Sequence, residues 1–150
     1  MNKTEIKSLL VEECRRRLLA TISELEATMA DFQQQANDYG APKDRYDSFR
    51  AQMMRRKDMM GQQLSKEMNE LKLLDRLDLK KESSTVSFGA MVITKDQNYF
   101  ISIGLGKMEV NNESYFIISP VVPISLAMNG KKKGDIFDFR GNRIEIEDVF

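Results

Sequence analysis

Aspartate side chains gather where the first forty residues of the chain give way to the next forty. They are Asp38, Asp44 and Asp47. Asp44 and Asp47 are three residues apart, so on a helix they share one face and their carboxylate oxygens can jointly bind a hard cation such as Mg²⁺. Aspartate is also favoured at helix starts, where it caps backbone amides and complements the helix dipole. The spacing leaves both roles open.

Two carboxylates do not make a tight Mg²⁺ site unless a partner supplies further oxygens. We therefore expect no metal to be tightly bound by this chain alone. A second candidate site is the basic run of Arg55, Arg56 and Lys57. Such a run can follow the phosphates of RNA or DNA, or it can be the solvated flank of a helix pair. The methionines around it, Met53, Met54, Met59 and Met60, suit either an adaptable binding face or a core.

The composition excludes several classes of site. The chain has no histidine and a single cysteine, which removes histidine metal ligands, Ser-His-Asp triads and a disulfide within the chain. Basic and acidic residues number 23 each, so the formal net charge is zero and nothing global favours nucleic acid or an anionic membrane as the main partner. No signal-peptide core is present, and no apolar run approaches the roughly 18 residues of a membrane span. We expect a cytoplasmic protein with no membrane partner and no enzymatic activity of its own.

The scaffold for these residues is predicted to be a long antiparallel helical hairpin over residues 1–80. Apolar residues recur at steps of three or four, the spacing of a coiled-coil seam. Gly40 and Pro42 place the reversal, so the tip lies near residues 38–44. We expect one helix from Thr4 to Asp38 and a second from after Pro42 to Leu79. The predicted seam residues are Val11, Cys14, Leu18, Ile22, Leu25, Met29, Phe32 and Ala36 in the first arm, and Tyr46, Phe49, Met53, Met60, Leu64, Met68, Leu71 and Leu74 in the second.

Residues 86–150 predict a small antiparallel β domain with one short helix, joined to the hairpin by a polar linker at residues 81–85. β-branched and aromatic residues alternate there between turn residues, among them Asn111-Asn112 and a glycine-containing turn at 140–142. The chain as a whole is therefore predicted to be α+β. The expected strands are 86–93, 99–103, 113–118, 136–139 and 143–149, and the expected helix lies within 121–128.

This order of elements, together with motifs in the tail, resembles the bacterial Gre transcript-cleavage factors (the GreA/GreB type). The motifs cover residues 86–149. They are Val86-x-Phe88-Gly89-Ala90-x-Val92, Tyr99-Phe100-Ile101-Ser102-Ile103-Gly104, Ser119-Pro120 followed by Ala127, Gly130-Lys131-Lys132 and Gly134-Asp135, and Gly141 with the alternating Ile144 and Ile146. The stretch from Ser119-Pro120 to the glycine is about three residues longer here than in the family.

The resemblance implies an FKBP-like β domain, without isomerase activity, that docks on the rim of RNA polymerase's secondary channel. Ser119 and Pro120 would belong to the partner-binding surface. The hairpin would enter the channel, where Arg55, Arg56 and Lys57 would contact polymerase or RNA. In the family two acids at the tip help to hold a Mg²⁺ of the polymerase, which itself performs the RNA cleavage. The only cofactor implied is this shared Mg²⁺.

The tip departs from the family pattern. The family reads approximately D-L-x-E-N-A-E-Y, whereas alignment on the tyrosine puts Tyr39 and Pro42 where the two acids belong. Asp38, with Asp44 or Asp47, reaches those places only after a local shift, and Lys43 and Arg45 oppose cation capture. Binding to polymerase is therefore expected to survive better than stimulation of cleavage. The alternative function is a coiled-coil interaction or chaperone-like adaptor with no role in transcription.

Overall fold

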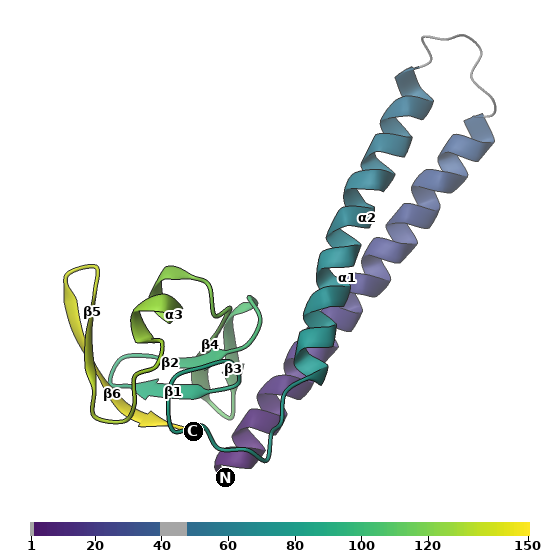
Figure 1. Cartoon of the computed structure of the whole chain (residues 1–150). Coiled ribbons are helices and arrows are strands. Elements are labelled where there is room, and N and C mark those ends of the chain that lie inside the picture. The colour runs from purple at the N-terminus through teal and green to yellow at the C-terminus, as the bar shows by residue number, and fades with distance from the viewer. Residues whose placement is uncertain (1, 40–47) are drawn as a thin grey trace. The chain divides into compact units, whose positions relative to one another are not determined.

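The computed structural model describes residues 2–39 and 48–150 (Figure 1). The predicted reversal at Gly40 and Pro42, and the candidate acids Asp44 and Asp47, therefore lie outside the described residues. The chain divides into two compact units, one made of Met1–Cys14 with Leu73–Phe150 and the other of Arg15–Lys72. The predicted domains, 1–80 and 86–150 with a linker at 81–85, have boundaries that differ from those of the two compact units. That these domains fold separately stays a prediction.

Two long helices form the hairpin. Helix α1 spans Lys3–Tyr39 and helix α2 spans Ser48–Asp75. At 1.5 Å per residue, α1 is about 55 Å long. It begins with a reciprocal cap, because Asn2 Oδ1 accepts a hydrogen bond from the Glu5 amide at 2.8 Å while Glu5 Oε2 accepts one from the Asn2 amide at 3.3 Å.

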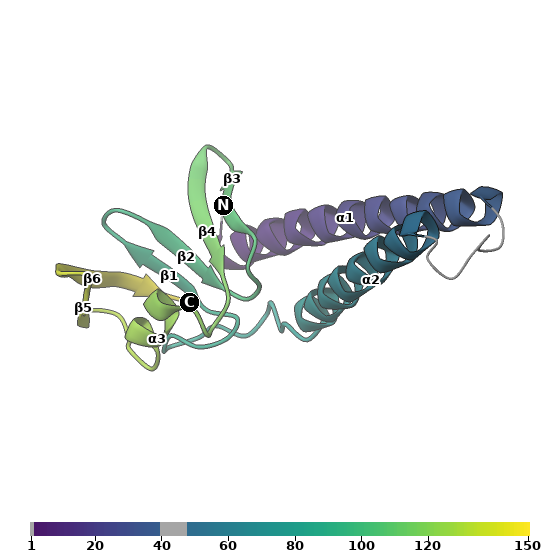
Figure 2. The same cartoon turned by 90° about the horizontal axis from the view of Figure 1, so that it is seen from above.

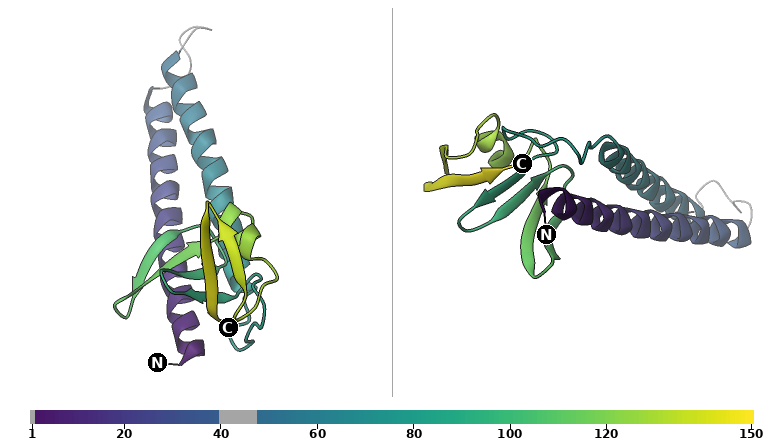
Figure 3. Two further views of the ribbon diagram at one scale, coloured as in Figure 1. Left: turned by 90° about the vertical axis from the view of Figure 1, so that its left-hand side faces the viewer. Right: turned by 90° about the horizontal axis from the view of Figure 1, so that it is seen from below.

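The helices run antiparallel and side by side, as Figure 3 also shows. The ring centroids of Tyr39 and Phe49 are 4.7 Å apart, with the rings tilted at 44°. Lys57 Nζ donates a hydrogen bond to Gln33 Oε1 at 2.7 Å. Gly61 lies beside Met29, whose Cε would be 3.6 Å from an added Cβ. Residues earlier in α1 thus contact residues later in α2, and these contacts define the register of the two helices.

The predicted seam is confirmed along α1, where all eight residues are buried or half-buried. In α2, Met53 and Leu74 are buried and Met60, Leu64 and Leu71 are half-buried. Phe49 and Met68 were also predicted on the seam and are exposed, but the Phe49 ring still contacts Tyr39 of α1. Met68 is therefore the misassigned position, because apolar spacing along α2 does not by itself fix how the helix is rotated about its axis against α1.

Six strands form one sheet in the order β3-β4-β2-β1-β6-β5. Their bounds are β1 Met91–Thr94, β2 Asn98–Ile101, β3 Gly106–Val110, β4 Glu113–Ile118, β5 Ile136–Phe139 and β6 Asn142–Val149, and helix α3 spans Pro123–Met128. Figure 2 shows β3–β4 and β5–β6 on opposite sides of β1 and β2. The α+β class, with a helical hairpin followed by a sheet and a short helix, is confirmed.

The predicted antiparallel sheet needs one correction, because β2 and β4 pair in parallel, with Phe100 opposite Ile117. The other pairings among the described strands are antiparallel. After β2 the chain forms β3 at the edge of the sheet. It then returns as β4, which lies between β3 and β2. This β3 strand was not predicted. The alternation of exposed Lys107 and Glu109 with buried Met108 is the signal that would have located it.

Two element boundaries also differ from those predicted. The first strand begins at Met91, not Val86, because Gly89 has a φ of 90° and the Ala90 amide bonds back to Ser87 O at 3.0 Å. Helix α2 ends at Asp75, short of Leu79. The next residues form a turn in which Asp78 Oδ1 accepts a hydrogen bond from the Lys80 amide at 3.1 Å, and such local bonds compete with continued helix.

The predicted hairpin turns are confirmed. Asn111 and Asn112 both have positive φ, and so do Arg140 and Gly141, the geometry of two-residue hairpin turns. One face of the sheet carries an apolar core with α3. Its buried members are Val86, Ala90, Val92, Tyr99, Ile101, Met128, Phe137, Ile146 and Val149.

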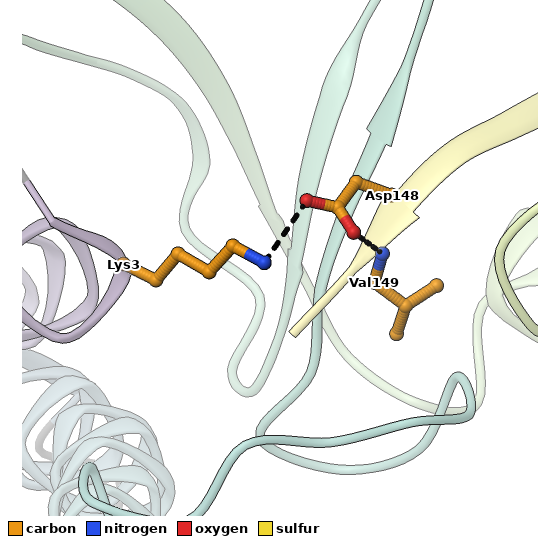
Figure 4. Close-up of polar contacts among 3 residues, drawn as sticks. All are labelled: Lys3, Asp148 and Val149. Atoms are coloured by element: carbon orange, nitrogen blue, oxygen red, sulfur yellow. Dashed lines mark hydrogen bonds and ion pairs between the residues drawn. The ribbon is translucent and has the colours of Figure 1, made fainter.

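The first turns of α1 lie against the end of β6, within the same compact unit. Lys3 Nζ is 3.3 Å from Asp148 Oδ2, and Asp148 Oδ1 accepts a hydrogen bond from the Val149 amide at 3.0 Å (Figure 4). The ammonium groups of Lys3 and Lys7 lie 5.1 and 5.7 Å from the centre of the Phe150 ring. Phe150 is itself held to β1 by paired backbone bonds with Met91. These contacts hold the first turns of α1 against the sheet within this unit.

Candidate partner-binding surfaces

Of the three predicted tip acids, Asp38 is the one whose position the structure describes. It is exposed in the last turn of α1, and its Oδ1 accepts a hydrogen bond from Gln34 Nε2 at 2.8 Å. The carboxylate is therefore oriented by its own helix and accessible from solvent. Among the described residues no group of three or more metal-binding side chains is found. The joint role proposed for Asp38 with Asp44 or Asp47 stays a prediction.

The basic run on α2 does not act as a unit. Arg55 and Arg56 are exposed, whereas Lys57 is half-buried and bonded across the hairpin to Gln33. Lys57 thus holds the two helices in register, and this part of the run is structural. The two arginines present their charge to solvent and remain candidates for contact with phosphate or acidic groups.

Arg56 also borders a groove on the hairpin with a volume of about 340 Å³. Its other lining residues are Phe32, Met59, Met60 and Gln63. Met59 is 69% exposed, whereas Met53 is buried in the seam. The methionines therefore divide between the two roles that the sequence left open, core filling for Met53 and a solvent-facing apolar surface for Met59.

Ser119 and Pro120 form a fixed turn between β4 and α3. Ser119 Oγ accepts a hydrogen bond from the Val121 amide at 3.2 Å, and the carbonyl oxygen of Ser119 accepts one from Ser125 Oγ at 2.7 Å. Ser125 is buried in α3, so this second bond anchors the turn to the helix. Pro120 is exposed. The turn presents a rigid, solvent-facing surface, as expected of a preorganised contact.

Exposed apolar side chains follow this turn, and sequence reasoning did not single them out. Val121 is 75% exposed, Leu126 in α3 is 62% exposed, and Ile136 at the start of β5 is 47% exposed. Strand β5 is an edge of the sheet and contacts α3. Large apolar side chains that are exposed on neighbouring elements are typical of surfaces that bind other proteins. The signal in the sequence is the apolar run Val121-Val122-Pro123-Ile124, which exceeds what one short helix can bury.

No helix in the described part of the chain is both long and apolar enough to cross a membrane. No family profile and no curated protein sequence matches this chain. Among solved structures, the chain is similar to the GreA factor homolog 1 (Gfh1) protein of Thermus thermophilus, with 14% identity over 91% of this chain and 94% of that chain and a TM-score of 0.34. It is also similar to a structure of the transcription factor Gfh1, with 15% identity over 90% of this chain and 92% of that chain and a TM-score of 0.34.

Proposed function

We propose that this protein is a transcription factor that binds RNA polymerase, docks through its sheet, and inserts the helical hairpin into the secondary channel. Its effect would be to modulate elongation, with weak or absent stimulation of RNA cleavage by the polymerase. In this proposal the chain has no catalytic activity of its own, and any Mg²⁺ that it approaches belongs to the polymerase.

The observation that carries the proposal is the hairpin itself. Residues 15–72 form a compact unit that does not include the sheet, and α1 is about 55 Å long. Its last described turn presents an exposed carboxylate at Asp38 and an aromatic pair, Tyr39 and Phe49, across the two helices. A two-helix rod with polar groups in its last described turn suits insertion into a narrow channel.

The surface at Ser119 and Pro120 supports a separate docking role for the sheet. Its turn is fixed by two hydrogen bonds, and Val121 and Leu126 beside it are exposed. Apolar anchors on a rigid backbone lose little conformational entropy on binding. This surface therefore fits the partner-binding role that the family resemblance implies for Ser119 and Pro120.

A binding measurement tests the proposal. We expect the full chain to bind core RNA polymerase, and Val121→Lys and Leu126→Lys each to weaken binding by roughly tenfold, since a lysine in a desolvated contact costs at least about 1.4 kcal/mol. Leu9→Lys, a matched change at an exposed leucine of α1, should leave both fold and affinity unchanged. If the unsubstituted chain does not bind polymerase, the proposal is wrong and the adaptor alternative is favoured.

A further inference from the structure

A groove of about 340 Å³ lies on one face of the helical hairpin, within a single compact unit of the chain. On this groove face Met59 is 69% exposed, and Phe32 of α1 and Met60 of α2 are half-buried beside it. Phe49 lies seven residues before Arg56, close to two helical turns, so its 40% exposed ring is on the same side of α2. Apolar side chains of both helices thus reach solvent together, which is typical of surfaces that bind another protein.

A carboxylate borders this groove along α1. Successive residues of an α-helix point about 100° apart, so the two neighbours of Phe32 lie on opposite sides of it. Gln33, which follows Phe32, is on the far face of the hairpin, where it accepts the hydrogen bond from Lys57. Asp31, which precedes Phe32, is therefore on the groove side of α1, and it is exposed. The exposed Arg56 lines the groove from α2, so the two borders carry opposite charges.

The same opposition of charge extends over this half of the hairpin. From residue 18 to 39, α1 has no basic residue and four acidic ones, Glu24, Glu26, Asp31 and Asp38. From residue 48 to 57, α2 has no acidic residue and four basic ones, Arg50, Arg55, Arg56 and Lys57. The acidic helix repels a phosphate backbone, which disfavours RNA or DNA as the occupant of the groove. A second copy of this chain is complementary in charge, provided that the acidic helix of one chain meets the basic helix of the other.

We propose that the groove face binds the groove face of a second chain, so that two hairpins form a four-helix bundle. In this two-fold dimer α1 of each chain packs on α2 of its partner, and Asp31 faces the partner's Arg56. The other two-fold arrangement, with α1 against α1, would bring the acidic residues together and is therefore disfavoured. The apolar side chains at the centre supply the affinity and the charges select the arrangement, because exposed ion pairs alone contribute little.

Self-association would also regulate the chain. In the dimer the groove face is covered and the hairpin is doubled in thickness, so a dimeric chain could not enter a channel that admits a single hairpin. This consequence rests on the proposed function, whereas the dimer itself does not, and it is tested below without polymerase.

Sedimentation velocity of the full chain over a concentration series tests the proposal. We expect a monomer–dimer equilibrium. Asp31→Arg and Arg56→Asp should each weaken dimerisation by roughly tenfold or more, because like charges then face each other at two places in the dimer. An equimolar mixture of the two variants should dimerise as the unsubstituted chain does, since every opposed pair in the mixed dimer again joins an acidic and a basic residue.

A pair of methionine variants tests the apolar part of the surface. Met59→Lys should weaken dimerisation roughly tenfold, because it places a charge at the centre of the contact. Met68→Lys is the matched control, since Met68 is 43% exposed but lies two and a half turns further along α2, on its opposite side. It should dimerise as the unsubstituted chain does. Far-UV circular dichroism verifies that each variant keeps its helices.

Three results would overturn the proposal. The first is an unsubstituted chain that sediments as a monomer at all concentrations, including one that binds an RNA oligonucleotide through Arg56 instead. The second is a mixture of the two charge variants that dimerises no better than either variant alone. The third is a Met68→Lys variant that is weakened as much as Met59→Lys.

Discussion

At the scale of single residues, the base of the hairpin holds an unusual buried charge. Lys7 is only 3% exposed, and burial lowers the pKa of its ammonium group, an effect partly opposed by Glu82. Its proton is therefore held less tightly in the folded chain than in the unfolded one. The Phe150 ring, 5.7 Å away, gives partial compensation through its π face.

Replacing this lysine by methionine should stabilise the protein. Lys7→Met removes a buried charge while keeping a long apolar side chain, and we expect the free energy of unfolding at pH 7 to rise by about 1 kcal/mol. In the unsubstituted chain stability should also rise with pH from the lowered pKa of Lys7 up to its ordinary value of 10.5, because the unfolded chain binds more protons in that interval. Urea denaturation at several pH values measures both effects.

Lys3→Met is the control for this substitution. Lys3 is half-exposed and pairs with Asp148, so its loss should change stability by less than about 1 kcal/mol. It should also leave the pH dependence assigned to Lys7 in place. If Lys7→Met destabilises the protein at pH 7, the contact of the ammonium group with Phe150 outweighs the cost of burial.

At the scale of elements, two glycines differ in whether the backbone around them requires glycine. Gly61 lies within α2, where glycine is unfavourable, and an added Cβ would meet Met29 Cε at an ordinary 3.6 Å. Gly89 has a φ of 90°, and a Cβ there would come within 3.2 Å of Leu77. Gly61 therefore makes the hairpin less stable than an alanine would, whereas Gly89 is required by the turn before β1.

We expect the two glycine-to-alanine substitutions to act in opposite directions. Gly61→Ala should raise the free energy of unfolding by up to about 1 kcal/mol through helix propensity. Gly89→Ala should lower it by about 1–2 kcal/mol through backbone strain. Urea denaturation followed by circular dichroism at 222 nm measures both. A destabilised Gly61→Ala variant would show that the helices pack more closely at Met29 than described.

The elements that the sequence predicted well are those with a local signal. The seam of α1 follows from apolar spacing alone, and the turns at Asn111-Asn112 and Arg140-Gly141 follow from asparagine and glycine, which tolerate positive φ. The parallel pairing of β2 with β4 is a contact between strands separated by a third, and no local pattern encodes it. The same holds for the candidate sites. Serine and proline marked the Ser119 turn, but the exposure of Leu126 and Ile136 depends on how α3 and β5 pack, which no local pattern encodes.

At the scale of the whole molecule, the proposal assigns different tasks to the two ends of one chain. The sheet and the Ser119 turn would supply docking, and the hairpin would reach the active centre of the polymerase. These tasks can be tested separately, because Asp38 on α1 and Lys107 on the edge strand β3 are both exposed and lie in different compact units.

The most direct measurement is photo-crosslinking of the full chain to core RNA polymerase, with benzoylphenylalanine placed at position 38 or, as a control, at position 107. If the hairpin enters the secondary channel, crosslinks from position 38 should map by mass spectrometry to polymerase segments around the active centre or to the RNA 3′ end, and those from position 107 should not. A bound chain whose position 38 crosslinks only to the outer surface of the polymerase, or to nothing, would contradict the account.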